Sequence, residues 1–178
     1  MSEVSSAALE RARRVRLMIF DVDGVLTDGR LWYGPAGEAL KAFHTLDGHG
    51  IRMLAQSGVV PAILSGRSSQ AVARRAAELG IGHVLQGIDD KQSAYAALLA
   101  QLGMQAEATG YAGDDVVDLP VLVRCGFACA PCEAPQAVRQ RVHYVCDSPA
   151  GAGAVREICE LVMRAQGSLE PALARYLA

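Results

Sequence analysis

Two aspartates near the start of the chain, Asp21 and Asp23, follow the apolar residues 17–20, which have the composition of a buried β-strand. If the strand continues through Val22, both carboxylates face one space, because side chains alternate along an extended chain, and Gly24 lets the backbone turn away. Carboxylates this close need a bound proton or a cation between them. The pair therefore indicates a chemical site; the alternative is an ordinary polar turn, where Asp and Gly are common.

Strands and helices are predicted to alternate around this pair. Further strands are predicted at residues 59–64, 83–85, 108–113, 127–130 and 143–145, and helices at 50–56, 68–79, 91–102, 116–124, 134–141 and 152–165. A turn cluster at 34–37 predicts a β-hairpin over residues 30–43. We therefore expect an α/β fold, a doubly wound, Rossmann-like parallel sheet with a β-hairpin insertion after the first strand.

Polar side chains follow several of these strands. Ser65 and Arg67 come after the strand at 59–64, Lys91 begins a helix, and three more acids follow the strand at 108–113, namely Asp114, Asp115 and Asp118. Ligands of doubly wound sheets bind at the carboxyl ends of the strands, so these side chains should share one site with the first two aspartates. The two cations do not balance the acids, and oxygen ligands select magnesium. Since magnesium takes phosphate oxygens as further ligands, the substrate should be a phosphate ester.

These residues, in this order, resemble the four motifs of the haloacid dehalogenase-like hydrolases: Asp-x-Asp-Gly-Val at 21–25, Ser-Gly-Arg at 65–67, Lys91, and Gly-Asp-Asp-x-x-Asp at 113–118. The resemblance implies that Asp21 is the nucleophile and forms an aspartyl-phosphate. It implies that Asp23 protonates the leaving alkoxide and then activates water. Ser65 would hydrogen-bond the phosphoryl oxygens, and Lys91 would neutralise their charge.

The same resemblance implies a magnesium site. Its ligands would be Asp21, the main-chain carbonyl of Asp23, and Asp114, while Asp115 and Asp118 would orient waters and Lys91. The second aspartate of the first motif is typical of phosphatases rather than dehalogenases. Roughly forty residues separate Asp23 from Ser65, and roughly two dozen separate Ser65 from Lys91. These connections are little longer than βαβ units require. We therefore expect a single domain, residues 1–178, without a cap domain.

A closer resemblance covers nearly the whole chain. The segments 22–29, 37–43, 47–51 and 151–157 are similar to the 3-deoxy-D-manno-octulosonate 8-phosphate phosphatase family, which acts in lipopolysaccharide precursor synthesis. This resemblance implies a homotetramer in which the hairpin, about 30–43, and the C-terminal tail, about 167–178, close the site of a neighbouring subunit. It also implies that the sugar and its anionic groups are contacted by His44, Thr45, Leu46, Asp47, Gly48, Arg52, Arg67, Arg75 and Lys91. Taken alone, Arg75 would be a solvated helix residue.

The composition of the chain argues against several other classes of protein. The net charge is −2, with 17 basic and 19 acidic residues and no long basic segment, so nucleic-acid binding is not expected. No secretory signal or membrane-spanning segment is evident, and we expect a cytoplasmic protein. The five cysteines are an odd number, which argues against a disulfide scaffold. The C-x-x-C at 129–132 lacks partners for zinc, so small buried thiols are the simpler interpretation.

Two alternatives remain open. A related branch acts on nine-carbon nonulosonate phosphates, so the sugar is less firmly indicated than the reaction. A non-catalytic phosphosugar-binding scaffold would keep the fold, but it would be expected to have lost the nucleophile or the acid. Both Asp21 and Asp23 are present.

Overall fold

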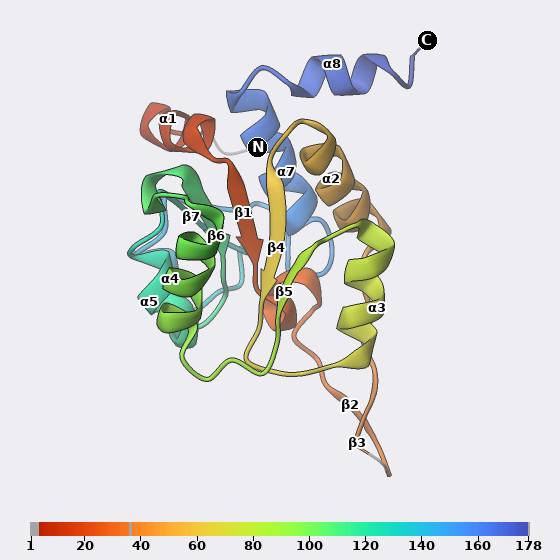
Figure 1. Ribbon diagram of the computed structural model, residues 1–178. Helices are drawn as coiled ribbons and strands as arrows, with labels where there is room; N and C mark the ends of the chain where they lie inside the picture. Colours follow the sequence, from red (N-terminus) through yellow and green to blue (C-terminus); the bar gives the residue numbers. More distant parts are fainter. Residues whose placement is uncertain (1–3, 36, 178) are drawn as a thin grey trace.

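The computed structural model, which describes residues 4–35 and 37–177, is built on a six-stranded parallel sheet (Figure 1). The strand order is β5-β4-β1-β6-β7-β8, with β1 in the middle. The strands are β1 (Leu17–Phe20), β4 (Val60–Leu64), β5 (His83–Leu85), β6 (Thr109–Ala112), β7 (Phe127–Ala130) and β8 (Tyr144–Val145). The two edge strands, β5 and β8, have only three and two residues. The predicted doubly wound sheet is confirmed.

Both faces of the sheet are covered, as the fully apolar sequence of β1 requires. Met18 and Phe20 belong to one core and Leu17 and Ile19 to the other, because successive side chains leave opposite faces of a strand. The first core is closed by α1 (Ser6–Arg14), α2 (Thr45–Gln56), α3 (Gln70–Leu79) and α7 (Ala154–Ala165). The second is closed by α4 (Lys91–Leu102), α5 (Leu119–Leu122) and α6 (Gln136–Arg139). A continuous apolar strand therefore marks a strand buried on both sides.

The first strand is shorter than predicted. It ends at Phe20, and the chain turns through a π-helical segment, η1 (Val22–Leu26), in which Gly24 has φ 87°. The positive φ explains the glycine, because a side chain at this angle is strained. The expectation that an extended strand through Val22 aligns the two aspartates is therefore wrong, and a tight turn positions Asp23 instead.

Helix α2 begins five residues earlier than predicted, at Thr45 rather than at residue 50. Gly48 and Gly50 weaken the helical pattern of the sequence. The structure gives both a reason: a Cβ at Gly48 would lie 2.2 Å from Arg75 Nη2, and one at Gly50 would lie 2.9 Å from Arg156 Cδ. Close packing of α2 against α3 and α7 therefore outweighs the low helix propensity of glycine.

The helix predicted at 116–124 is instead a 3₁₀ turn, η3 (Val116–Asp118), followed by the single turn α5. Pro120 stands in the first turn of α5, where a missing N–H is tolerated. Helix α6 is likewise shorter than the predicted 134–141. A second 3₁₀ turn, η2 (Ala106–Ala108), leads into β6.

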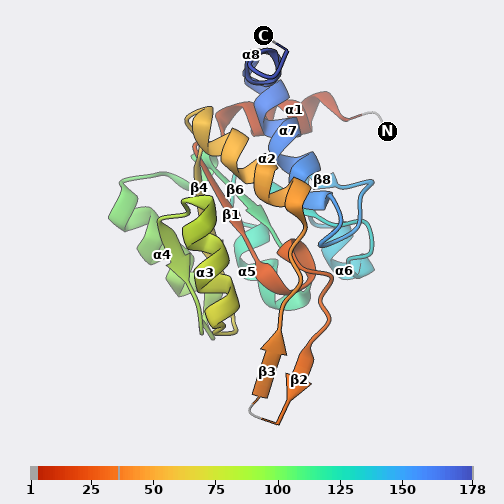
Figure 2. The same ribbon diagram turned by 90° about the vertical axis from the view of Figure 1, so that its right-hand side faces the viewer.

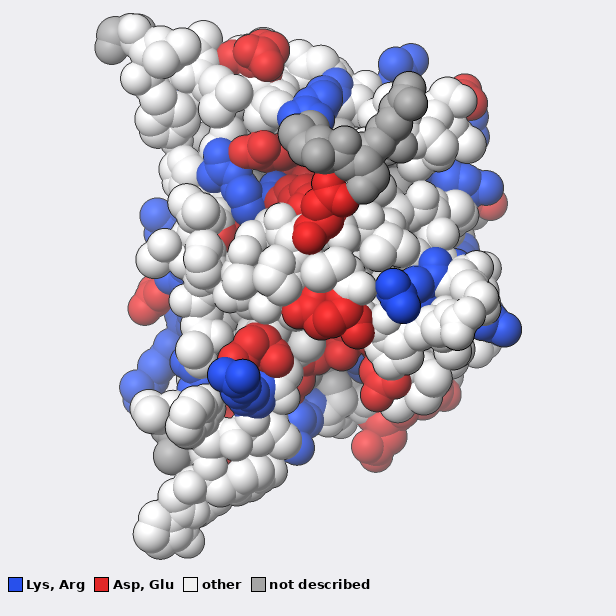
Figure 3. Space-filling view, turned by 180° about the vertical axis from the view of Figure 1, so that it is seen from behind, with Lys and Arg blue, Asp and Glu red and all other residues white. Residues whose placement is uncertain are grey.

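The predicted hairpin is present as β2 (Trp32–Gly34) paired antiparallel with β3 (Gly37–Leu40). It projects from the end of the sheet where β1 terminates (Figures 1 and 2). Trp32, Tyr33 and Leu40 are 54%, 63% and 67% exposed, so three large apolar side chains face solvent. In Figure 3 the projecting tip is free of charged atoms, which gather nearer its base. Apart from this hairpin, the described residues between β1 and β4 contain no insertion large enough for a cap domain.

The C-terminal tail includes a short helix, α8 (Leu169–Ala174), where the sequence predicts only a tail. Leu169 is buried and joins the first core. Figure 1 shows α8 at the end of the sheet opposite to the hairpin. No helix among the described residues is long and apolar enough to cross a bilayer.

Candidate active site

A cleft of about 320 Å³ opens at the carboxyl end of the sheet. The ends of β1, β4 and β6 and the start of α4 bring together most of the predicted catalytic residues. The cleft is lined by Asp21, Asp23, Ser65, Gly66, Arg67, Ile88, Asp89, Lys91, Asp114, Asp115 and Val117. These residues come from four separate connections, and the parallel sheet alone brings them to one edge.

Asp21 and Lys91 form the buried centre of the cleft. Lys91 Nζ lies 3.0 Å from Asp21 Oδ2, and the two side chains are 5% and 8% exposed. Lys91 also donates to Asp118 Oδ1 at 2.6 Å, so one ammonium joins two carboxylates. Burial opposes the charge of the lysine, but the two carboxylates outweigh it and raise the pKa of Lys91. The lysine is therefore held charged beside the proposed nucleophile.

Asp118 is fully buried and its two oxygens are occupied by donors. Oδ1 accepts from Lys91 and, at 2.6 Å, from the hydroxyl of Tyr111. Oδ2 accepts from the amides of Asp114 and Asp115, at 3.1 and 3.3 Å. A carboxylate with these four bonds orients its neighbours and has little capacity left for a metal ion. The sequence reading missed Tyr111, which appeared there only as a strand residue.

Asp21 and Asp114 carry negative charge that the protein does not balance. Burial and the charge of Asp118 raise the pKa of Asp21 to about 6, although Lys91 opposes the shift. Burial and the charges of Asp118 and Asp21 raise the pKa of Asp114 to about 7. Oxygens of Asp21, Asp114 and Asp118 lie within 4.8 Å of one another. The neighbouring carboxylates of Asp21 and Asp114, whose pKa values are raised, fit a hard divalent cation such as magnesium.

Gly24 makes room for this cluster. A Cβ at position 24 would lie 2.1 Å from Asp114 Oδ2 and 2.5 Å from Asp114 Cγ. The turn after β1 therefore passes directly against the Asp114 carboxylate, and only glycine leaves space there. The two motifs that contain Gly24 and Asp114 are 90 positions apart in the chain and in contact in the fold.

Ser65 and Asp115 occupy the rim of the same cleft. Ser65 is 2% exposed, and its Oγ accepts from the amide of Arg67 at 3.4 Å. The carboxylate of Asp115 accepts from the amide of Val116 at 2.7 Å and caps η3. Asp115 thereby shapes the turn that carries Asp118.

Asp23 faces the hairpin. Its Oδ1 accepts from Lys41 Nζ, and Arg67 Nε lies 3.7 Å from its Oδ2. Lys41 also contacts Glu38, 3.1 Å away, and its side chain is only 1% exposed. The sequence placed Lys41 and Glu38 in the hairpin and in the family-like segment 37–43, but neither was predicted as a site residue. The chain has only two lysines, at 41 and 91, so a rare charge beside a turn was a usable signal.

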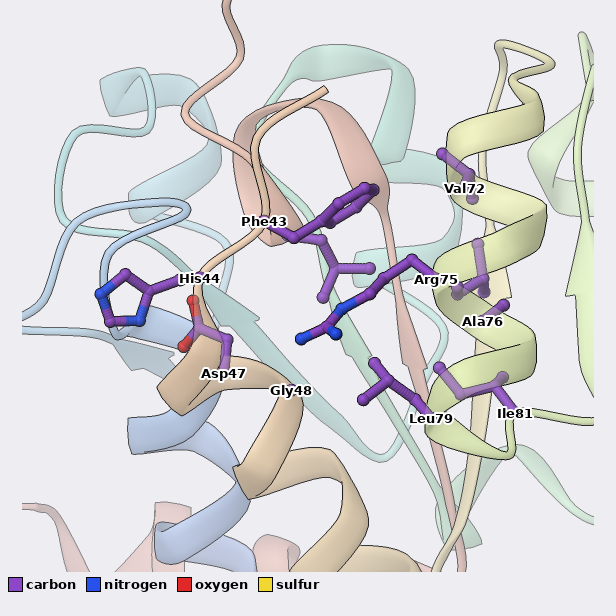
Figure 4. Close-up of a pocket in the computed structure, with 11 residues that line it drawn as sticks. Phe43, His44, Asp47, Gly48, Val72, Arg75, Ala76, Leu79 and Ile81 are labelled. Carbon is purple, nitrogen blue, oxygen red and sulfur yellow. The ribbon is translucent and has the colours of Figure 1, made fainter. Parts of the chain in front are cut away.

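Four of the predicted sugar-binding residues, namely His44, Asp47, Gly48 and Arg75, line a different pocket beside α2 (Figure 4). Arg75 reaches across from α3 toward Gly48, while the ring of His44 lies beyond Asp47 and points away from Arg75 (Figure 4). The remaining lining residues are apolar: Leu26, Phe43, Ile63, Val72, Ala76, Leu79 and Ile81. None of this group lines the cleft of Asp21, whereas Arg67 lines that cleft. The structure thus brings together the predicted catalytic residues but leaves most predicted sugar contacts apart from them.

Several of these side chains already have partners within the protein. Asp47 is 1% exposed and accepts from the amides of Gly153 and Arg156, at 3.3 and 2.8 Å, at the start of α7. Arg75 pairs with Glu78 at 3.2 Å, and Arg52 donates to the main-chain carbonyl of Glu78. By contrast, His44 Nδ1 is buried without a hydrogen-bond partner among the described residues. The exposed residues of the set are Thr45, Leu46 and Arg52.

The sheet order and the buried aspartate, lysine and aspartate cluster at the end of β1 define the class: a haloacid dehalogenase-like hydrolase without a cap domain. No protein-family model matches the chain. A 3-deoxy-D-manno-octulosonate 8-phosphate phosphatase, KdsC, from Yersinia pestis is 44% identical over 169 residues, 95% of this chain and 90% of that protein. The chain therefore belongs to the 3-deoxy-D-manno-octulosonate 8-phosphate phosphatase family.

Solved structures agree with this assignment. A protein from Pseudomonas syringae that is described as a probable YrbI family phosphatase superposes with a TM-score of 0.96 at 47% identity, covering 98% of this chain and 99% of that one. A 3-deoxy-D-manno-octulosonate 8-phosphate phosphatase from Moraxella catarrhalis has a TM-score of 0.93 at 40% identity, covering 95% and 97%. That protein was solved in complex with a magnesium ion, a phosphate ion and a KDO molecule.

Proposed function

We propose that this protein is a magnesium-dependent phosphatase that hydrolyses 3-deoxy-D-manno-octulosonate 8-phosphate to the free sugar and phosphate in lipopolysaccharide precursor synthesis. The observation that carries the proposal is the buried Asp21 carboxylate, 3.0 Å from the Lys91 ammonium at the end of β1. Family membership and the sugar-bound relative support the choice of substrate. The intact cluster argues against a non-catalytic scaffold.

In the proposed reaction, an oxygen of Asp21 attacks phosphorus, and the bond from phosphorus to the sugar oxygen breaks. Asp23 gives a proton to the departing alkoxide. A water molecule then attacks the aspartyl-phosphate and passes its proton to Asp23, which releases phosphate and restores Asp21. This order divides one difficult hydrolysis into two easier steps.

Lys91 and Ser65 would stabilise the phosphoryl group during both steps. The Lys91 ammonium is buried and already aimed at Asp21, so it adds positive charge without reorganisation. Ser65, at the end of β4, offers a hydroxyl to the phosphoryl oxygens. Magnesium, held by Asp21, Asp114 and the main-chain carbonyl of Asp23, would offset the negative charge of the phosphate and of the two carboxylates. Asp115 and Asp118 would keep waters and Lys91 in place.

We further propose that the sugar is recognised by residues at the base of the hairpin and around α2. Arg67 lines the cleft beside Asp23 and suits an anionic or hydroxyl group of the substrate. The set around α2 is His44, Thr45, Leu46, Asp47, Gly48, Arg52 and Arg75. His44, Asp47, Gly48 and Arg75 line another pocket, and Thr45, Leu46 and Arg52 are exposed, so these residues would reach substrate only at a distance from the phosphate, or in a neighbouring subunit's site.

A homotetramer is the assembly that we propose. The exposed Trp32, Tyr33 and Leu40 support it, because a two-stranded hairpin is marginal in water unless it packs on something. In this arrangement the hairpin, and the tail that contains α8, would close a neighbouring site. Sizing by light scattering should give four chains; a fully active monomer would contradict the proposal. We also propose that residues 1–178 form one domain and that the protein is cytoplasmic.

The function is tested by phosphate release from purified protein with magnesium. We expect turnover of the eight-carbon sugar phosphate, abolished by Asp21→Asn or by excess chelator and retained in the control Glu10→Gln, which alters an exposed acid on α1. Activity that survives Asp21→Asn would refute the proposed chemistry. Parallel turnover of a nonulosonate 9-phosphate decides between the two sugars: faster hydrolysis of the nine-carbon ester would refute the proposed substrate alone.

A further inference from the structure

The hairpin carries a buried cation that contacts the proposed acid. Lys41 follows β3, and its side chain is 1% exposed, although it belongs to a segment that projects from the domain. Its ammonium contacts two carboxylates, Asp23 Oδ1 and, at 3.1 Å, Glu38 Oε2. A buried ammonium persists only where such partners offset its lost hydration. Lys41 is therefore fixed by Asp23 on one side and by its own hairpin on the other.

A second cation completes the group. Arg67 Nε lies 3.7 Å from Asp23 Oδ2, and its Nη2 lies 3.7 Å from Glu38 Oε2. The same Nη2 donates to the hydroxyl of Tyr33 at 2.7 Å. The carboxylates of Asp23 and Glu38 thus each contact both cations, Lys41 and Arg67. This group joins the turn after β1, the hairpin and the end of β4, and its formal charges cancel.

The two oxygens of Asp23 differ in their surroundings. Oδ1 is held by Lys41, whereas Oδ2 is buried and has no hydrogen bond among the described residues. Arg67 is 43% exposed at the side chain and makes only a long contact with Oδ2, so it restrains Asp23 less than Lys41 does. Contact with Lys41 fixes the orientation of the carboxylate and leaves Oδ2 to exchange a proton with the substrate.

We propose that Lys41 is a positioning residue for the acid and base Asp23, so that the hairpin of each subunit sets the geometry of proton transfer in its own cleft. The inference rests on the proposed function, in which Asp23 protonates the sugar oxygen. Lys41 itself touches neither the phosphoryl group nor Asp21. Its effect should therefore appear only where the reaction needs that proton.

The test compares two substrates that differ in this need. A sugar phosphate releases an alkoxide and requires the acid, whereas p-nitrophenyl phosphate releases a stable phenolate and does not. The kcat/KM value reports the steps up to departure of the leaving group. For Lys41→Met we expect kcat/KM toward the sugar phosphate to fall between about 10- and 100-fold, as misplaced catalytic groups do. For p-nitrophenyl phosphate we expect a change of less than about threefold, on the same reasoning.

Further variants separate positioning from folding. Lys41→Gln removes the charge but keeps a polar side chain, and should show the same selective loss. Arg14→Met removes an exposed cation from α1, away from the hairpin and the cleft, and should change neither rate. Asp23→Asn measures how far kcat/KM toward the sugar phosphate falls when the acid itself is removed. In the Asp23→Asn background, Lys41→Met should cost nothing further, because a residue that acts through Asp23 has no effect once the acid is gone.

The outcomes distinguish this inference from the proposed function. Equal losses on both substrates, no loss on either, or an additional loss in the Asp23→Asn background would each overturn the role of Lys41 and leave the function standing. Failure of the unmodified protein to hydrolyse either ester, or equal losses on both substrates for Asp23→Asn alone, would overturn the proposed function and the inference with it. A selective, non-additive loss with both Lys41 variants supports the inference.

Discussion

Gly24→Ala should damage the metal site more than the fold. The new methyl group would stand 2.1 Å from Asp114 Oδ2, well inside contact distance, so the carboxylate must move. The substitution also forces alanine to φ 87°, which costs about 1–2 kcal/mol. At roughly 2–4 °C per kcal/mol for a chain of this size, the melting temperature should fall by about 2–8 °C. Displacement of a metal-binding carboxylate should raise the magnesium concentration for half-maximal activity at least about 10-fold.

Gly80→Ala is the matched control. Gly80 ends α3 at φ 74°, and a Cβ there meets nothing within 4 Å. It should show a similar thermal loss with an unchanged magnesium requirement. Thermal unfolding and magnesium titration of phosphate release measure the two effects separately. The reasoning is refuted if Gly24→Ala keeps the normal magnesium requirement, or if Gly80→Ala alters it as strongly.

Three further predictions concern other contacts. Since the pKa values of Asp21 (about 6) and Asp114 (about 7) lie above the ordinary 3.8, the metal-free folded protein binds protons more tightly than the unfolded chain. Its stability should therefore fall from about pH 4 to about pH 7, and magnesium should raise the melting temperature more at the higher pH; a flat profile in chelator would contradict this. Tyr111→Phe removes a donor to Asp118 and should cost about 0.5–1.5 kcal/mol in denaturant unfolding, with up to about a 10-fold loss of kcat/KM; unchanged values would contradict the role of the hydroxyl. Asp47→Ala removes the cap of α7 and should destabilise the protein by about 0.5–2 kcal/mol, more than Asp47→Asn; equal effects would argue against capping.

Local sequence patterns predicted much of the fold. Helix α4 and strands β5 and β7 have the predicted bounds, because each is a continuous pattern ended by glycine or a turn. Helix α2 was predicted too short, since the reason for its glycines is the tertiary packing of Arg75 and Arg156. The β1 strand was predicted too long, because the apolar pattern continues into a turn that only the positive φ of Gly24 reveals.

The candidate site, like the fold, could be predicted from the sequence only in part. Asp21, Lys91 and Asp114 follow from strand-end positions, which a parallel sheet must bring to one edge. The rarity of lysine singles out Lys41, but its contact with Asp23 forms only because the hairpin returns the chain to its base, so the sequence does not reveal the partner. Asp47 reaches the start of α7 across more than a hundred residues, so its capping role could not be read locally, and the family resemblance implied a sugar contact for it instead.

The short edge strands of the sheet have a consequence for how copies of the chain can meet. An exposed edge is a template for another chain's strand, and the length of the template sets how many main-chain bonds an intruding strand can gain. Here β5 offers three residues and β8 two, so stacking of molecules edge to edge into a continuous sheet gains little. Pairing of sheet edges can therefore add little to a contact between copies of the chain, whereas the hairpin leaves the apolar side chains of Trp32, Tyr33 and Leu40 exposed.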